Sequence, residues 1–358
     1  MKNAKKSFWA STLIGLVFLA GCGQQAAVEE TSQSATTTDG DIVIGFSLSD
    51  LRVERWQIDR DVFTETAQEL GASVIAVSAD LDADAQESQA ENLILQGVDA
   101  LVVVAQDGEK ASAIVEKAHA AGIPVIAYDR LIKNSDLDYY ISFDNVKVGE
   151  YEAKGVLDKV SSGKFAYLGG SPTDNNAFLV KEGSMKLLQP KIDSGEIELV
   201  LDEFNDGWKS DEAYKHLKAY LDKNGTIDAV VAANDGTALG AIQALEEVGL
   251  AGTVPVSGQD ASLGACQLIA EGKQTVSVYK PIQSIAKKAA EMAVNAAKGN
   301  NVATNQTVNN GKIEVPSYLL DVSMVTKDNL MDTVIKDGFQ SYDSVYQNVP
   351  EDERPARQ

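Results

Sequence analysis

The feature that most constrains the fold is a regular alternation of short apolar runs with helical stretches, which begins near residue 41 and continues through most of the chain. Between the runs, Ala, Ile and Val recur at spacings of three and four, as in 110–121 and 238–248, and this spacing predicts helices. Strands buried on both faces read as continuous apolar runs, and alternating strand and helix units form parallel sheets. The runs predict strands at 42–46, 73–77, 100–104, 124–127, 139–142, 165–168, 198–201, 229–232, 254–256 and 275–279, with 319–325 as a late edge strand.

The number of strands indicates that they are divided between two sheets. A strongly twisted open sheet rarely exceeds about ten strands, and a chain of 358 residues is longer than one ordinary domain. We therefore predict an α/β protein with two similar doubly wound parallel-sheet lobes.

The first 40 residues differ from the rest and indicate export. Three lysines stand within the first six residues, and an apolar run follows at 8–20, too short to span a bilayer comfortably. The run ends in Leu-Ala-Gly-Cys, which resembles the bacterial lipobox. We predict a lipoprotein signal peptide at 1–21, lipidation of Cys22, and a disordered Gln-, Ser- and Thr-rich tether at 22–40. The alternative is an ordinary secretory signal that happens to contain a cysteine.

Charge and composition exclude several function classes. The net charge is −22, so binding of nucleic acid through a basic surface is not expected. Two His and two Cys leave little material for a zinc site or a His-dependent catalytic triad. No Gly-x-Gly-x-x-Gly or Gly-Lys-Ser/Thr motif is present, so we expect no nucleotide and no other cofactor.

Acidic residues stand at the ends of several predicted strands. Ligands of parallel α/β sheets bind in the crevice beyond the carboxyl ends of the strands. Asp is also a favoured helix N-cap at the same positions. We expect about half of these acids to act as caps, Asp80 and Asp144 first. The six residues are Asp50, Asp80, Asp129, Asp144, Asp235 and Asp260.

Three groups of strand ends carry mixed charges that a cap does not explain. They are 50–56, 128–130, and 234–235 together with 258–260 and 278–280. Carboxylates accept hydrogen bonds from hydroxyls, Arg and Lys donate them, and Asn does both, which is the mixture that a sugar requires. Trp56 and Trp208 could supply apolar walls for a sugar ring, and the alternative for each is ordinary core or lid packing.

Other chemistry-bearing residues receive structural interpretations. The acids from Asp80 to Glu91 match the ligand spacing of a calcium loop, but Ala85 stands where that loop requires Gly. We therefore interpret the run from residue 84 as the start of a helix and expect no metal site. His119 and His216 lack a neighbouring nucleophile. These two histidines are predicted to be structural, and Cys266 is predicted to lie in the core.

Six motifs together resemble the D-xylose-binding protein family, the substrate-binding subunits of xylose uptake transporters within the type I sugar-binding proteins. The resemblance covers roughly residues 41–340. The motifs are Asp-Leu-Arg-Val-Glu-Arg-Trp at 50–56, Ala-Tyr-Asp-Arg at 127–130, Tyr-Ile-Ser-Phe-Asp-Asn at 140–145, Gly-Gly-Ser-Pro-Thr-Asp-Asn-Asn at 169–176, Gly-Gln-Asp at 258–260 and Val-Tyr-Lys-Pro at 278–281.

The resemblance implies two lobes joined by a three-strand hinge, with the sugar enclosed between them. It implies a first lobe of 41–147 with 283–315, and a second of 148–282 with 316–345, leaving 346–358 as a tail. The family's sugar contacts fall on Arg55, Asp129, Arg130, Asn176, Trp208, Asn234, Asp260 and Lys280, and Trp56 would stack on the ring or form its wall.

The implied function is capture of D-xylose or a similar monosaccharide by a lipid-anchored monomer at the outer face of the cytoplasmic membrane. An ABC transporter permease would receive the sugar. One alternative is a sensor that presents sugar occupancy to a membrane histidine kinase, and another is a binding protein for ribose or galactose. An enzyme is not expected. Arg130 beside Asp129 keeps that carboxylate ionised, which suits an acceptor better than the general acid of a glycosidase.

Overall fold

The computed structural model describes residues 42–52 and 54–357. The predicted signal peptide, the tether and Cys22 lie outside the described residues. Within the described part of the chain, no helix is both long and apolar enough to cross a membrane.

The first of the sheets has seven strands in the order β10-β11-β5-β4-β3-β1-β2. All neighbours are parallel except the β10–β11 pair. The strands are β1 (Ile42–Leu48), β2 (Ala72–Ser78), β3 (Ala100–Val103), β4 (Val125–Tyr128), β5 (Tyr139–Phe143), β10 (Gln306–Asn309) and β11 (Glu314–Leu320).

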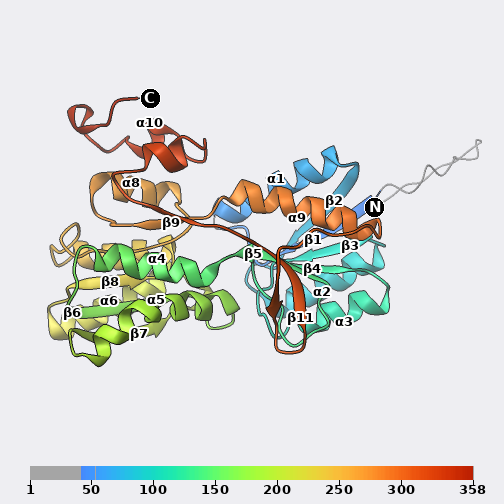
Figure 1. The fold of residues 1–358 in the computed structure, drawn as a ribbon, viewed down its shortest axis with the longest axis horizontal. Coiled ribbons are helices and arrows are strands. Elements are labelled where there is room, and N and C mark those ends of the chain that lie inside the picture. Colours follow the sequence, from blue (N-terminus) through green and yellow to red (C-terminus); the bar gives the residue numbers. More distant parts are fainter. Residues whose placement is uncertain (1–41, 53, 358) are drawn as a thin grey trace, which may run out of the picture. The chain divides into compact units, whose positions relative to one another are not determined.

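Helices cover both faces of this sheet, as the continuous apolar runs predict. On one face, α1 (Glu54–Glu69) and α9 (Ile282–Ala297) lie side by side and bury Phe63 and Ile285 against β1, β3 and β4 (Figure 1). On the other face, α2 (Ala83–Leu95) and α3 (Ser112–Ala120) close a second apolar cluster.

The second lobe is built around a three-stranded parallel sheet in the order β7-β6-β8. Single bridges, Val230–Val256 and Gln259–Val278, continue it toward the antiparallel pair β9 and β12. The strands are β6 (Gly163–Gly169), β7 (Ile197–Phe204), β8 (Ala229–Ala232), β9 (Ser277–Tyr279) and β12 (Ser323–Val325). The helices are α4 (Asn145–Leu157), α5 (Asn175–Asp193), η1 (Asp206–Trp208), α6 (Ser210–Asn224), α7 (Asp235–Glu246), α8 (Leu263–Glu271), η2 (Met331–Ile335), α10 (Tyr342–Val345) and η3 (Glu351–Glu353).

Three strand predictions differ from the structure. The run at 254–256 forms only isolated bridges. The predicted edge strand at 319–325 is divided, because β11 ends at Leu320 in the first sheet and β12 pairs with β9 in the second lobe. The sequence indicated no strand at β10, where three of four residues are polar and most are exposed because the strand lies at the edge of the sheet.

The chain passes between the two lobes at three places. They lie between β5 and α4, between β9 and α9, and between β11 and β12 (Figure 1). Because β11 pairs with β5 through Leu320, residues 316–320 belong to the first sheet rather than to the second lobe. The other predicted lobe limits stay predictions. The segment called a tail includes Tyr346 and Val349, which are buried in an apolar cluster with α8.

Candidate functional site

A cavity of about 470 Å³ lies between the two lobes at the carboxyl ends of the strands. This volume includes space that is open to solvent. The cavity is lined by all nine predicted side chains, Arg55, Trp56, Asp129, Arg130, Asn176, Trp208, Asn234, Asp260 and Lys280, and also by Asp50, Asp174, Gly207 and Gln259.

Three lining residues have left-handed backbone conformations, which are uncommon outside glycine. The φ angles are 61° at Asp129, 57° at Trp208 and 94° at Asp260. The surroundings hold Asp129 in this conformation, because its carbonyl accepts hydrogen bonds from Tyr140 Oη at 3.0 Å and Ser142 Oγ at 2.7 Å. Such conformations persist where packing imposes them, and they are concentrated at ligand sites.

Arg55, in the first turn of α1, joins carboxylates from both lobes. Its guanidinium forms ion pairs with Asp129, with Asp59 at 3.2 Å, and with Asp260 of the second lobe at 3.5 Å. Burial opposes the charge of this side chain, which is 6% exposed, but the carboxylates outweigh that effect and raise the pKa of Arg55 well above its ordinary value. Arg55 is therefore a permanently charged donor at the base of the cavity.

Asp129 is a fixed acceptor opposite Arg55. Burial alone would raise the pKa of its carboxyl, but the charges of Arg55 and Lys280 prevail and lower the pKa. The Asn176 side-chain amide donates to its Oδ1 at 3.0 Å, and Asn145 in turn donates to Asn176 Oδ1 at 3.0 Å. These contacts orient the carboxylate and keep it ionised.

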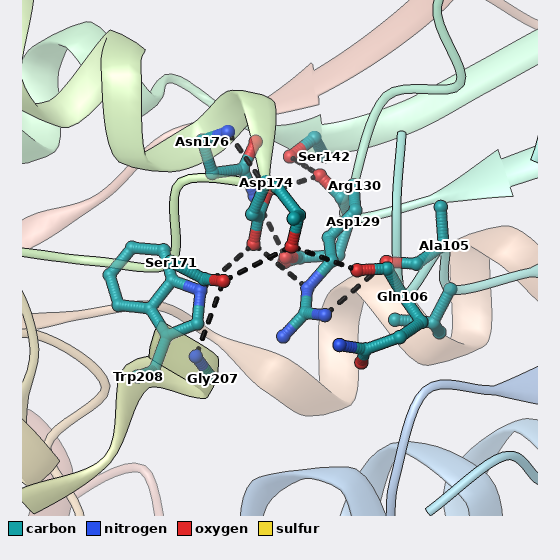
Figure 2. A network of polar contacts seen from close by, with 12 residues as sticks. Ala105, Gln106, Asp129, Arg130, Ser142, Ser171, Asp174, Asn176, Gly207 and Trp208 are labelled. Carbon is teal, nitrogen blue, oxygen red and sulfur yellow. Dashed lines mark hydrogen bonds and ion pairs between the residues drawn. The ribbon is translucent and has the colours of Figure 1, made fainter. Parts of the chain in front are cut away.

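Asp174 connects three predicted contact residues, and the sequence analysis did not include it among them. Its Oδ2 pairs with Arg130 Nε at 2.9 Å and accepts a hydrogen bond from Trp208 Nε1 at 3.1 Å, while Oδ1 accepts from the Asn176 amide at 2.9 Å (Figure 2). Burial raises the pKa of Asp174, and the charge of Arg130 opposes the rise. Its position just after β6 and before α5 was the signal that could have identified it.

The two tryptophans form walls of the cavity in different ways. Trp56 is buried in the apolar cluster under α1, and the guanidinium carbons of Arg55 and Arg130 lie 4.3 and 5.4 Å from the centre of its ring. Trp208 lies so close to Gly170 that a Cβ there would be 2.2 Å from the indole. Trp56 therefore packs in the core and also lines the cavity, and its contact with a sugar ring stays a prediction.

Some strand-end residues have the capping role that was expected. Asp144 caps α4 by accepting from the Lys147 amide at 2.9 Å. Asn234, predicted as a contact, also caps α7 through its Oδ1, which accepts from the Thr237 amide at 2.7 Å. The prediction for Asp80 was wrong: α2 is capped by Asp82, two residues later, because the chain first makes a left-handed turn at 80–81.

The segment at 80–91, the two histidines and Cys266 are the other residues for which a structural role was predicted. Helix α2 runs through 83–95, as predicted, and within the part of the chain that the structure describes no three His, Cys, Asp or Glu residues are grouped to hold a metal. His119 pairs with Asp138 at 2.8 Å and His216 with Asn205 at 3.2 Å, both away from the cavity. Cys266 is buried in α8, which confirms its place in the core.

The arrangement can bind a small polyhydroxylated molecule. Ionised carboxylates, charged donors and an amide face a space walled by two indoles. A ring with hydroxyls at its edge and C–H groups on its faces satisfies this lining.

Comparisons with known proteins agree with this geometry. Residues 44–301 match the family model described as "Periplasmic binding protein domain". The chain is 48% identical to the D-xylose-binding periplasmic protein of Haemophilus influenzae, over 87% of this chain and 95% of that protein. It is 50% identical to the protein of the same name from Escherichia coli, over 84% of this chain and 91% of that protein.

Among solved structures, an ABC transporter solute binding protein from Clostridium phytofermentans with bound β-D-glucose is similar at a TM-score of 0.78. Its sequence identity to the chain is 29%, and the match covers 85% of this chain and 99% of that one.

Proposed function

The chain belongs to the periplasmic binding protein family, and on that premise we propose that it captures D-xylose between its two lobes and delivers it to an ABC transporter permease. The observation that carries the proposal is the convergence of all nine predicted contact side chains on one cavity. The relatives that share about half of its residues are D-xylose-binding proteins.

The mechanism is capture followed by closure. Arg55 and Asp129 offer a charged donor and acceptor from the first lobe, while Asp260 and Trp208 approach from the second. A sugar that contacts both sets binds the closed state more tightly than the open one, so it shifts the equilibrium toward closure. The permease then recognises the closed form. The buried polar groups of the site need hydrogen-bond partners on the sugar. Sugars whose hydroxyls cannot supply those hydrogen bonds therefore bind more weakly.

The site is proposed to bind and not to cleave. The chain's relatives are binding proteins. In the cavity, Asp129 has a lowered pKa, unlike the raised pKa that a glycosidase's general acid requires. Asp174 has a raised pKa, but its carboxylate is engaged by Arg130 and Trp208. Incubation with a chromogenic xyloside should release no chromophore, and turnover above that of a heat-treated sample would contradict this part of the proposal.

The protein works outside the cytoplasm, as its periplasmic relatives do. We propose that a lipid on Cys22 keeps it, as a monomer, at the outer face of the membrane near its permease. Cys22→Ala should move the protein from the membrane fraction to the soluble fraction. Unchanged fractionation would contradict the proposed lipid anchor and would leave the proposal for the sugar site unaffected.

Calorimetric titration with D-xylose, glucose, ribose, galactose and arabinose tests the ligand. We expect xylose to bind with about micromolar affinity, worth roughly −8 kcal/mol, and the other sugars to bind more weakly. Arg55→Ala and Asp260→Ala should abolish binding. Arg60→Ala is the matched control, because Arg60 lies on the same helix, pairs with Asp61 and does not line the cavity.

Two other outcomes of the titration would redirect the assignment. Tighter binding of ribose or galactose would change the ligand and leave the mechanism intact. If no sugar binds a folded sample, capture for transport fails. Co-purification with a histidine kinase instead of a permease would favour the sensor alternative.

A further inference from the structure

A second cavity adjoins the sugar cavity on the side of α1 and α7, and its space of about 740 Å³ is partly open to solvent. We call it the apolar chamber, because its exposed lining is mostly apolar and includes Ile58, Leu239, Ala265, Leu268, Ile282 and Phe339. These side chains come from both lobes.

The apolar chamber and the sugar cavity share one wall. Arg55, Trp208, Asn234 and Asp260 line both spaces. The two spaces therefore meet at four side chains that are predicted to hold the sugar.

Two carboxylates at the chamber already have several partners within the protein. Asp235 accepts from Gln274 at 3.0 Å, from Ser277 at 2.8 Å and from the Ser262 amide at 2.8 Å. Asp260 Oδ1 is paired with Lys280 at 3.1 Å as well as with Arg55.

These partners decide which kind of substituent the chamber favours. A hydroxyl placed in the chamber would lose its hydrogen bonds to water and would find few free hydrogen-bonding groups in the wall. That exchange is unfavourable. An apolar group would gain about 25 cal/mol for each Å² that it buries.

We propose that the site accepts a pentopyranoside whose anomeric oxygen carries an apolar aryl or alkyl group, and that this group occupies the apolar chamber. The proposal rests on the sugar-binding function above and extends it from free xylose to apolar xylosides. A second sugar ring, which is polar all round, is a poorer occupant.

The test compares methyl and phenyl D-xylopyranosides of both anomers by calorimetric titration of the full chain, with free xylose and xylobiose alongside. Both members of a methyl–phenyl pair block the anomeric hydroxyl, so only the apolar area differs. For at least one anomer we expect phenyl to bind about tenfold more tightly than methyl, equivalent to about 1.4 kcal/mol.

Filling the chamber should remove this gain selectively. Gly264 lies in the first turn of α8, and no atom lies within 4 Å of the place where its Cβ would stand. Gly264→Leu should bring the phenyl xyloside to the affinity of the methyl xyloside and leave xylose unchanged. Retained xylose binding shows that the variant is folded.

Adding a charge at the chamber gives an independent test with a matched control. Leu239 on α7 lines only the chamber and is 50% exposed, whereas Leu95 on α2 is 78% exposed and lines neither cavity. Leu239→Asp should lower the phenyl preference several-fold, and Leu95→Asp should leave it unchanged.

The outcomes separate this proposal from the proposed function. If xylose binds but neither phenyl anomer exceeds its methyl counterpart, the apolar chamber is not a ligand site. Tighter binding of xylobiose than of both phenyl xylosides would overturn its apolar character. If xylose itself does not bind, the proposed function fails first.

Discussion

At the scale of single residues, Asp174 is the side chain on which the geometry of the cavity most depends. It is 3% exposed and holds Arg130 of the first lobe, Trp208 of the second, and the backbone of Asn176. In Asp174→Asn, the negative charge opposite Arg130 is lost, and the side-chain NH₂ must face at least one of the three donors. We expect affinity for xylose to fall about 10–100-fold, in line with the loss of one charge-assisted bond. Calorimetry measures the change.

Asp144→Asn is the control for this prediction. Asp144 also caps a helix, but it caps α4 from an exposed position and does not line the cavity. Each variant should lose at most about 1 kcal/mol of unfolding free energy from its cap, and only Asp174→Asn should lose sugar affinity. Equal affinities would refute the positioning role of Asp174.

The buried carboxyl of Asp235 leads to a prediction about how the unfolding free energy depends on pH. Burial, with the nearby charge of Asp260, raises the pKa of Asp235 to about 7. Between about pH 4 and pH 7 the folded state keeps this proton and the unfolded state loses it. The carboxyl therefore contributes stability fully below about pH 4, and the contribution is lost as pH rises toward 7.

Asp235→Asn removes this titration. We expect the unfolding free energy of the native chain, relative to the variant, to decline by about 1.4 kcal/mol per pH unit between pH 5 and pH 6, and less steeply as pH approaches 7. Urea denaturation at a series of pH values measures the difference. Parallel pH profiles for the two proteins would contradict the raised pKa.

At the scale of elements, the packing of α4 against α5 supports the site residues that lie at the start of α5. A Cβ on Gly149 would lie 1.8 Å from the carbonyl oxygen of Val180, so the two helices pack backbone against backbone. Gly149→Ala must push them apart and should cost about 1–3 kcal/mol of unfolding free energy. Because α5 begins beside Asp174 and Asn176, sugar affinity should fall too.

Gly264→Ala is the matched control for this prediction. Its Cβ would meet open space in α8, and Ala favours a helix over Gly by about 0.5–1 kcal/mol. It should therefore raise stability slightly, as measured by denaturation. A destabilisation equal to that of Gly149→Ala would show that backbone packing is not the cause.

At the scale of the whole molecule, the site exists only where the lobes meet. Arg55–Asp260 and Arg130–Asp174 join them through ion pairs, and the Gly108 amide donates to the Thr173 carbonyl at 3.1 Å. A ligand bound by both lobes stabilises the folded state by about 2.7 kcal/mol at a hundred times its dissociation constant.

Tryptophan fluorescence reports this stabilisation directly. Beyond the predicted signal peptide the sequence holds only Trp56 and Trp208, and both line the cavity. We expect xylose to change the emission and to shift the denaturation midpoint upward. Arg55→Ala should do neither. A shift that persists in this variant would mean that xylose acts elsewhere.

Much of the site could be predicted because polar residues at strand ends are a local signal. Asp129 stands two residues after the apolar run at 124–127 and Asp260 four residues after the run at 254–256, and each lines the cavity. The role of Asp174 could not be predicted in the same way. Its partners Arg130 and Trp208 lie 44 and 34 residues away in the chain, and only folding brings them to one carboxylate.

The sequence by itself determined the α/β class and the strand ends that carry the chemistry, because a strand buried on both faces must be apolar along its length. Tertiary structure decided how those strands are divided between the two lobes. The run at 319–325 supplies the end of β11 to the first lobe and β12 to the second, and β10 pairs with β11 although three of its four residues are polar. The tertiary structure also forms the apolar chamber, which Ile58, Leu239 and Phe339 line together. Ladder partners and cavity walls depend on packing between distant segments, which no local pattern encodes.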